Sequence, residues 1–222
     1  MCGRFALFAS GEELRERYPF VDPSLFEPRY NIAPTQAVAA VRSTATGQEL
    51  VRLRWGLIPS WAADPAIGKK LLNARAETVA EKPSFRSAIK RRRCLIPASG
   101  FYEWQKTGAR RKQPYFIRPR DGGLFAFAGL WEEWHDPRGE VVETCTILTT
   151  EANDLMRPLH DRMPVILDPT SDARWLDAGA DAASLHALLV PYHSEKMEAF
   201  PVNPWVSNPK HEGPRCLETL AP

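Results

Sequence analysis

The second residue of the chain would carry two nucleophiles if it became the first. Cys2 follows Met1 and precedes a glycine, and cells remove an initiator methionine when the next side chain is small. The new terminus would hold an amine and a thiol on adjacent carbons, with ordinary pKa values of about 7.7–8.0 and about 8.5. Such a 1,2-aminothiol condenses with an aldehyde to an imine, and its thiolate then closes a thiazolidine ring. We therefore expect Cys2 to react with aldehydes, although a lone cysteine near a terminus usually has no such role.

The remaining cysteines give no sign of a metal site or of disulfides. Cys94, Cys145 and Cys216 are far apart and form no CxxC pair, so neither zinc nor another cofactor is expected. The first ten residues lack the apolar run of a signal peptide, and no stretch of about 18 apolar residues predicts a membrane span. We expect a cytoplasmic protein without disulfides, in which Cys94 and Cys145 are buried as small hydrophobic residues.

Charge is distributed unevenly along the chain, although the net charge is only +2. Residues 42–120 contain 18 Lys and Arg against 5 Asp and Glu, whereas the remainder contains 11 basic and 22 acidic residues. This asymmetry is typical either of a solvated basic face or of a phosphate-binding surface on an acidic body. Charge alone does not decide between the two interpretations.

The elements that must position these residues are short. Ser10 and Glu13 form a capping-box pattern, which predicts a helix to about Tyr18. Segments 36–42 and 49–57 predict a hairpin about Gly47, in which Leu53, Trp55 and Leu57 face the core and Arg52 and Arg54 face outward. Further strands are predicted at 94–96, 100–104, 114–118, 124–131 and 144–150, helices at 83–90, 153–159, 171–177 and 182–189, an extended loop at 20–35 and an irregular segment from 197.

The length and the 20 prolines favour one domain over residues 1–222. We expect an α+β fold, with a curved, largely antiparallel β-sheet forming a barrel-like core and short helices around it.

Six sequence blocks, in order, resemble the SOS response-associated peptidase (SRAP) family, whose members are abasic-site processing proteins. The blocks are Met-Cys-Gly-Arg-Phe at 1–5, Tyr-Asn-Ile-Ala-Pro at 30–34, Arg-Trp-Gly-Leu-Ile-Pro at 54–59, Asn-Ala-Arg-Ala-Glu-Thr at 73–78, Gly-Phe-Tyr-Glu-Trp at 100–104 and His-Asp-Arg-Met-Pro at 160–164. They extend over most of the chain, and their number and order make the resemblance specific. It implies the SRAP fold and a reaction at the amino-terminal cysteine.

The resemblance also implies a catalytic set of four residues. Cys2 would form a thiazolidine with the open sugar of an abasic site, and Asn73 would hold the reacting terminus by hydrogen bonds. Glu103 and His160 would transfer protons. Without the resemblance, we would interpret Asn73 as a helix cap, Glu103 as an outward-facing strand residue and His160 as a structural hydrogen-bonding group.

A second set of residues is implied to bind DNA. Arg4 and Arg75 match positions that contact the phosphates beside the lesion, and Thr149 and Arg162 are expected to join them. Trp61 and Pro34 match positions that stack on or wedge against neighbouring bases. The expected partner is single-stranded DNA with an abasic site, bound by a monomer without a metal. The crosslink would shield the lesion from strand cleavage and reverse slowly, and the family's peptidase label would reflect release of Met1.

Two rival functions fit parts of the same sequence. Class II glutamine amidotransferases also begin Met-Cys-Gly and use an amino-terminal cysteine, so ammonia release from glutamine would distinguish them. A non-catalytic module that binds single-stranded nucleic acid would use the basic segment alone and would form no adduct that resists denaturation.

Overall fold

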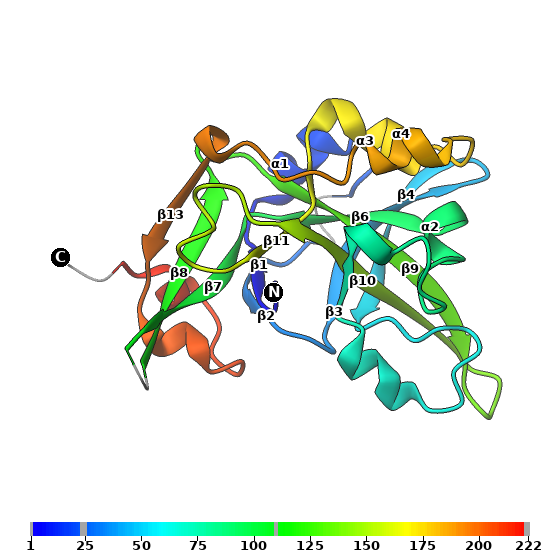
Figure 1. Ribbon diagram of the computed structural model, residues 1–222, viewed down its shortest axis with the longest axis horizontal. Coiled ribbons are helices and arrows are strands. Elements are labelled where there is room, and N and C mark those ends of the chain that lie inside the picture. Colours follow the sequence, from blue (N-terminus) through cyan, green and yellow to red (C-terminus); the bar gives the residue numbers. More distant parts are fainter. Residues whose placement is uncertain (1, 23–25, 109–110, 220–222) are drawn as a thin grey trace.

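The computed structural model describes residues 2–22, 26–108 and 111–219, the side chains of Thr107 and Arg111 excepted, and β-strands dominate it (Figure 1). The strands are β1 (Phe5–Leu7), β2 (Arg29–Ile32), β3 (Ala37–Thr44), β4 (Gly47–Trp55), β5 (Asn73–Arg75), β6 (Arg93–Ala98), β7 (Gly100–Thr107), β8 (Arg111–Pro119), β9 (Phe125–His135), β10 (Val141–Glu151), β11 (Arg162–Pro164), β12 (Ile166–Leu167) and β13 (Met197–Pro201). The α-helices are α1 (Gly11–Arg17), α2 (Ala88–Arg91), α3 (Pro169–Leu176) and α4 (Ala182–His186). Short 3₁₀ helices are η2 (Pro65–Lys70), η3 (Ala76–Thr78), η4 (Ser194–Lys196), η5 (Pro204–Ser207) and η6 (Pro214–Leu217).

The larger sheet closes on itself. β10 pairs with β4 in parallel and with β9 in antiparallel orientation, while β3 and β6 connect β4 to β9. Five strands therefore form a ring, which leaves no free edge among them. β10 has 11 residues and extends past the end of β4, so its second half pairs with β5 and β11. The expected α+β fold with a barrel-like, largely antiparallel core is confirmed.

The smaller sheet lies against the barrel and carries the start of the chain. Its strand order is β13-β8-β7-β1-β2, and every pairing in it is antiparallel. Figure 1 shows β1 near the centre, with β7 and β8 on one side and the barrel strands β3 and β10 on the other. The ring of Phe5 packs against Trp55 and Phe127 of the barrel, at 5.3 and 5.9 Å between centroids. β1 therefore leads the chain start into the space between the two sheets.

Most of the predicted elements are present. The capping box of Ser10 and Glu13 is formed at α1, and all five later strand predictions are confirmed with longer bounds. In the hairpin, Leu53, Trp55 and Leu57 are fully buried, Arg52 is exposed and Arg54 is half-buried. Cys94 and Cys145 are also fully buried, as expected. The helices at 171–177 and 182–189 are present as α3 and the shorter α4.

Four local predictions are wrong. Segment 83–90 is mostly turns, with only α2 helical at its end, and Ser87 makes no capping hydrogen bond there. Segment 153–159 is also turns, because Pro158 has no amide hydrogen to continue a helix and disfavours helical geometry in the residue before it. The loop at 20–35 contains β2, which pairs with β1. The tail begins with β13, which pairs with β8 over its whole length.

Among the described residues, no helix has both the length and the apolar character needed to cross a membrane.

Candidate active site

Cys2 lies fully buried between the two sheets, where Asn73 holds it. The Asn73 amide Nδ2 donates a hydrogen bond of 3.0 Å to the backbone carbonyl of Cys2. Asn73 reaches this point because it begins β5, which is paired in parallel with the second half of β10. Its other polar atom, Oδ1, is buried and has no hydrogen-bond partner within the described part of the chain. An acceptor left open at this place could bind an ammonium or hydroxyl group at the reacting terminus.

Glu103 lies on β7, the strand next to β1, and its charge acts on the Cys2 thiol. The Tyr102 amide donates to the Arg4 carbonyl at 2.9 Å, so the β1–β7 ladder continues toward Cys2. Glu103 is 4% exposed, and burial raises the pKa of its carboxyl while the positive charge of His160 lowers it in part. A carboxyl with a raised pKa keeps its proton to higher pH than an ordinary glutamate does, which suits it to proton transfer.

The pKa of the Cys2 thiol is not the ordinary value that the sequence led us to expect. Burial raises its pKa far above the usual cysteine range, and the negative charge of Glu103 raises it further. The thiol is therefore protonated in this structure, and it needs a base before its sulfur can act as a thiolate.

His160 faces Glu103 across an open pocket. Its Nδ1 lies 2.9 Å from the Arg162 backbone amide and 2.7 Å from a carboxylate oxygen of Asp161. A neutral ring accepts the first hydrogen bond and a charged ring donates the second, so Nδ1 has a suitable neighbour in either protonation state. The pocket has a volume of about 610 Å³ and is lined by Glu103, Trp104, Lys106, Lys112, Pro158, Leu159, His160 and Asp161.

The arginines predicted to bind phosphate differ in how they are held. Arg75 is exposed. Arg4 is partly buried, which lowers the pKa of its guanidinium, and its Nη1 donates to Asn31 Oδ1 at 2.7 Å and to the Val206 carbonyl at 3.0 Å. Arg4 therefore also fastens the carboxy-terminal segment to β2.

Arg162 and Thr149 form part of one network. The Arg162 guanidinium is paired with Glu77 and donates to the Thr149 carbonyl at 2.6 Å. The Thr149 side chain is fully buried, with its hydroxyl 3.4 Å from Arg162 Nη2. In this conformation Thr149 supports Arg162 and presents no side-chain atom to solvent.

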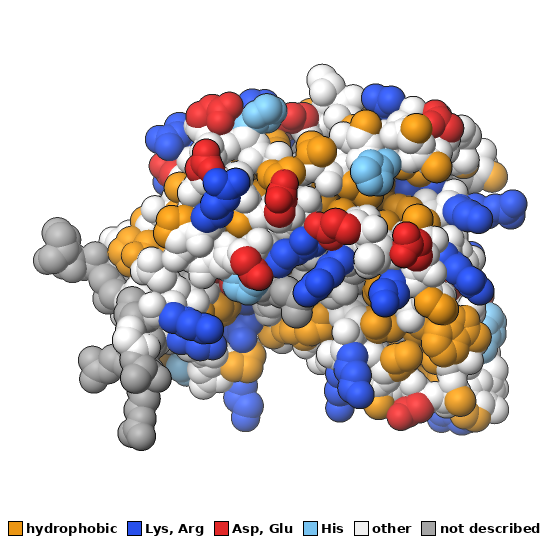
Figure 2. Space-filling model, in the orientation of Figure 1, with side chains coloured by type: hydrophobic (Ala, Val, Ile, Leu, Met, Phe, Trp, Pro, Cys, Tyr) orange, Lys and Arg blue, Asp and Glu red, His pale blue; other side chains and the backbone are white. Residues whose placement is uncertain are grey.

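The residues predicted to contact bases lie at the surface. Trp61 is 60% exposed and borders a 270 Å³ hollow with η2, while Pro34 is half-buried. On the face in Figure 2, Lys and Arg side chains lie in both halves, several of them around the hollow of the lower half, whereas most Asp and Glu side chains lie in the upper half. A surface with this distribution of charge can follow the phosphates of a nucleic acid strand.

The structure thus brings together Cys2, Asn73, Glu103 and His160, which come from four different segments. Sequence reasoning did not single out Asn31, Glu77, Asp161, Lys106 or Lys112. The first three lie within the matched sequence blocks, so the blocks themselves were the signal for them. The two lysines flank the turn predicted at Gly108, and they lie opposite each other on β7 and β8.

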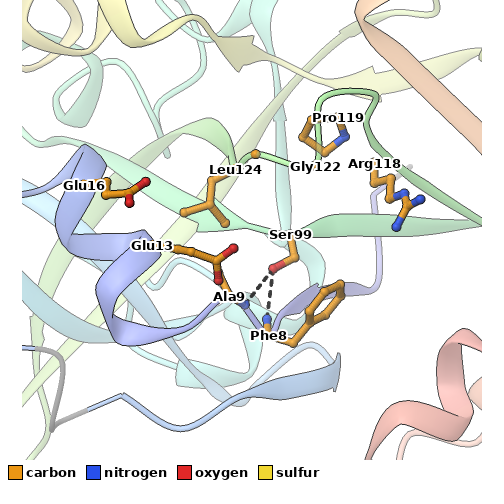
Figure 3. A pocket seen from close by; sticks show the side chains of 10 residues that line it. Phe8, Ala9, Glu13, Glu16, Ser99, Arg118, Pro119, Gly122 and Leu124 are labelled. Atoms are coloured by element: carbon orange, nitrogen blue, oxygen red, sulfur yellow. Dashed lines mark hydrogen bonds between the residues drawn. The ribbon is translucent and has the colours of Figure 1, made fainter.

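A third pocket, of about 340 Å³, lies between α1 and the turn after β8 (Figure 3). In its wall, Ser99 Oγ accepts hydrogen bonds from the amides of Phe8 and Ala9, at 3.0 and 3.1 Å. These bonds hold the chain as it leaves β1. None of the predicted site residues lines this pocket. Among the described residues, no group of three or more His, Cys, Asp or Glu side chains is placed to hold a metal ion.

The fold and the site define a class of α+β proteins in which a cysteine at the start of the chain is buried between a closed barrel and a second sheet. The family model described as SOS response associated peptidase (SRAP) matches residues 1–209, and the chain belongs to this family.

Proteins named abasic site processing proteins are similar to nearly the whole chain. Abasic site processing protein YoqW of Bacillus subtilis is 44% identical over 223 residues, covering 99% of this chain and 100% of that protein. Abasic site processing protein HMCES of Mus musculus is 31% identical, covering 98% of this chain and 75% of that protein. A crystal structure of a Bacteroides thetaiotaomicron protein superposes with a TM-score of 0.90 at 31% identity, covering 99% of this chain and all of the other.

Proposed function

We propose that the protein processes abasic sites in single-stranded DNA by forming a covalent bond through Cys2 after Met1 is removed. Met1 lies outside the described residues, and its loss is part of the proposal. The observation that carries the proposal is the hydrogen bond from Asn73 to the buried Cys2, beside the proton-transferring carboxyl of Glu103. The similarity to proteins named abasic site processing proteins supports the same substrate.

The reaction needs only groups that the site supplies. Glu103 and His160 assist opening of the abasic sugar to its aldehyde. The Cys2 amine attacks the aldehyde carbon, a C–N bond forms, and the hydroxyl leaves as water with a proton from His160 to give an imine. The sulfur then adds to the same carbon while Glu103 moves the thiol proton to nitrogen, which closes the thiazolidine without further loss of atoms. Reversal of these steps would regenerate the aldehyde.

Ring closure explains why the product would protect the strand. An open imine favours β-elimination and breakage of the DNA, whereas a thiazolidine carbon no longer activates that elimination. Single strands suit the site because an unpaired sugar can open and reach a buried terminus. The exposed guanidinium of Arg75 and the exposed ring of Trp61 can bind phosphate and base without reading sequence.

The test is an incubation of protein bearing its native terminus with a uracil-containing oligonucleotide treated with uracil glycosylase. A denaturing gel should show an adduct, and its intact mass should equal the protein without Met1 plus the oligonucleotide, less one water. Cys2→Ala should abolish the adduct. Cys94→Ala, which removes another fully buried thiol, should retain it.

Several outcomes would reject the proposal. They are an adduct of normal yield from the Cys2→Ala protein, an adduct that still contains Met1, or a crosslink mapped to another side chain. Ammonia release from glutamine without any adduct would instead identify an amidohydrolase. Binding of intact and abasic strands with equal affinity and no adduct would identify a binding module.

A further inference from the structure

The guanidinium of Arg162, which is expected to bind a DNA phosphate, is paired in this structure with the carboxylate of Glu77. Both oxygens of Glu77 accept hydrogen bonds from Arg162, at 2.6 Å from Nη1 and 2.9 Å from Nη2. This two-point geometry is the one that a guanidinium also offers to two oxygens of a phosphate. As the site stands, the remaining Nη2 hydrogen is directed to the Thr149 carbonyl, so a phosphate would find most of the fork already occupied.

Glu77 lies on the solvent side of Arg162, where an incoming anion could replace it. The Arg162 side chain is 14% exposed, whereas the Glu77 side chain is 51% exposed, so the carboxylate lies on the solvent side of the pair. Glu77 sits in the three-residue η3, which has no side-chain capping bond. Arg162 would stay in place without Glu77, because the Thr149 carbonyl holds it from the inner side.

The surroundings favour a second anion at this point. Arg75, exposed on β5 opposite Thr149, lowers the pKa of Glu77 by its charge, although the hydrogen bond from Arg162 is the larger cause. Arg162 binds the Glu77 carboxylate through two hydrogen bonds, and the charge of Arg75 adds a smaller electrostatic attraction to it. The Arg162 Nε is buried and has no hydrogen-bond partner among the described residues. Anion binding here would use the fork that Glu77 fills.

We propose that Glu77 is a displaceable stand-in for a DNA phosphate, which leaves the Arg162 fork when a phosphodiester takes its place between Arg162 and Arg75. The inference rests on the proposed function and names the phosphate site beside its reacting groups. The two non-bridging oxygens replace the two carboxylate oxygens, and no covalent bond changes. Because the Arg162 amide donates to His160 and Arg75 lies two residues after Asn73, a phosphate bound here lies next to the reacting groups.

The test compares Glu77→Gln with Glu81→Gln, an exposed residue in the same segment that loses the same charge without contacting the fork. The probe is an intact, fluorescently labelled oligothymidine, with affinity measured by anisotropy over a range of KCl concentrations. Because a partly exposed ion pair contributes up to about 1 kcal/mol, Glu77→Gln should bind about 2- to 5-fold more tightly than Glu81→Gln. The affinity of both variants should fall as salt rises, since binding of the phosphate releases counterions from the strand.

Weaker binding by Glu77→Gln would overturn the proposal, because it would mean that Glu77 only positions Arg162. Equal changes in the two variants would also overturn it, since they would reflect net charge alone. The assay uses an intact strand and needs no reaction of Cys2, so the result is the same on a Cys2→Ala background. A lost crosslink with a normal difference between the variants would therefore reject the covalent reaction and leave the phosphate site supported.

Discussion

Removal of the Asn73 amide should slow crosslinking, because this amide holds the backbone of Cys2 in place. Asn73→Ala deletes the 3.0 Å hydrogen bond to the Cys2 carbonyl and leaves that carbonyl, at a fully buried residue, without its donor. Loss of a partner to a buried acceptor costs about 1–3 kcal/mol. If this energy serves to hold the reacting terminus, the rate should fall by about 5- to 150-fold, since each factor of ten corresponds to about 1.4 kcal/mol.

The assay is single-turnover crosslinking, with samples quenched in denaturant and separated on a gel. The matched control is Gln113→Ala, because Gln113 Nε2 also donates from a half-buried amide to backbone carbonyls, those of Val202 at 2.8 Å and of Pro114 at 2.9 Å. Both variants should lose similar thermal stability, and only Asn73→Ala should lose rate. A normal rate for Asn73→Ala, or an equal loss in both variants, would refute the reasoning that the hydrogen bond positions Cys2.

Two further predictions concern the carboxyl and the exposed ring. Because burial raises the folded-state pKa of Glu103, the folded state favours the protonated form, and the contribution of Glu103 to stability is lost as pH rises from the usual glutamate pKa through the raised one. Glu103→Gln should therefore slow crosslinking yet flatten the pH dependence of the melting temperature in that window, and an unchanged dependence would contradict the assignment. Trp61→Ala should leave the melting temperature unchanged, since the ring is 60% exposed, and should weaken single-strand binding by about 1–3 kcal/mol in a titration; normal affinity would exclude stacking.

Local patterns predicted the strands well because the strand signal is itself local. Alternation in 49–57 places Leu53 and Trp55 on one face wherever the strand is paired, and β4 confirms it. The closure of the barrel had no such signal. It depends on β10 pairing with β4 and β9 at once, which joins residues about 90 positions apart, such as Arg54 and Thr144.

The two shortest strands of the site, β5 and β11, were not predicted from the sequence, for a related physical reason. β5 and β11 have three residues each, too few for any periodicity, and they are strands only because β10 extends beyond β4 and offers them partners. These two strands carry Asn73, Arg75 and Arg162. The sequence blocks therefore indicated these residues as candidates, but not the reason that they meet.

The raised pKa of the Cys2 thiol could not be predicted from the sequence, because it depends on burial and on the nearness of Glu103. From residue type alone, the Cys2 amine and thiol are comparable nucleophiles, whereas burial and Glu103 raise the thiol pKa so far that thiolate is scarce at neutral pH. An amine attacks as the neutral base and needs no anion, and with an ordinary pKa of about 7.7–8.0 a useful fraction is neutral at that pH. In the proposed reaction the C–N bond therefore forms before the C–S bond. In that proposal the sulfur adds only once an imine stands beside it and Glu103 can take its proton, so burial of the thiol would set the order of the two steps.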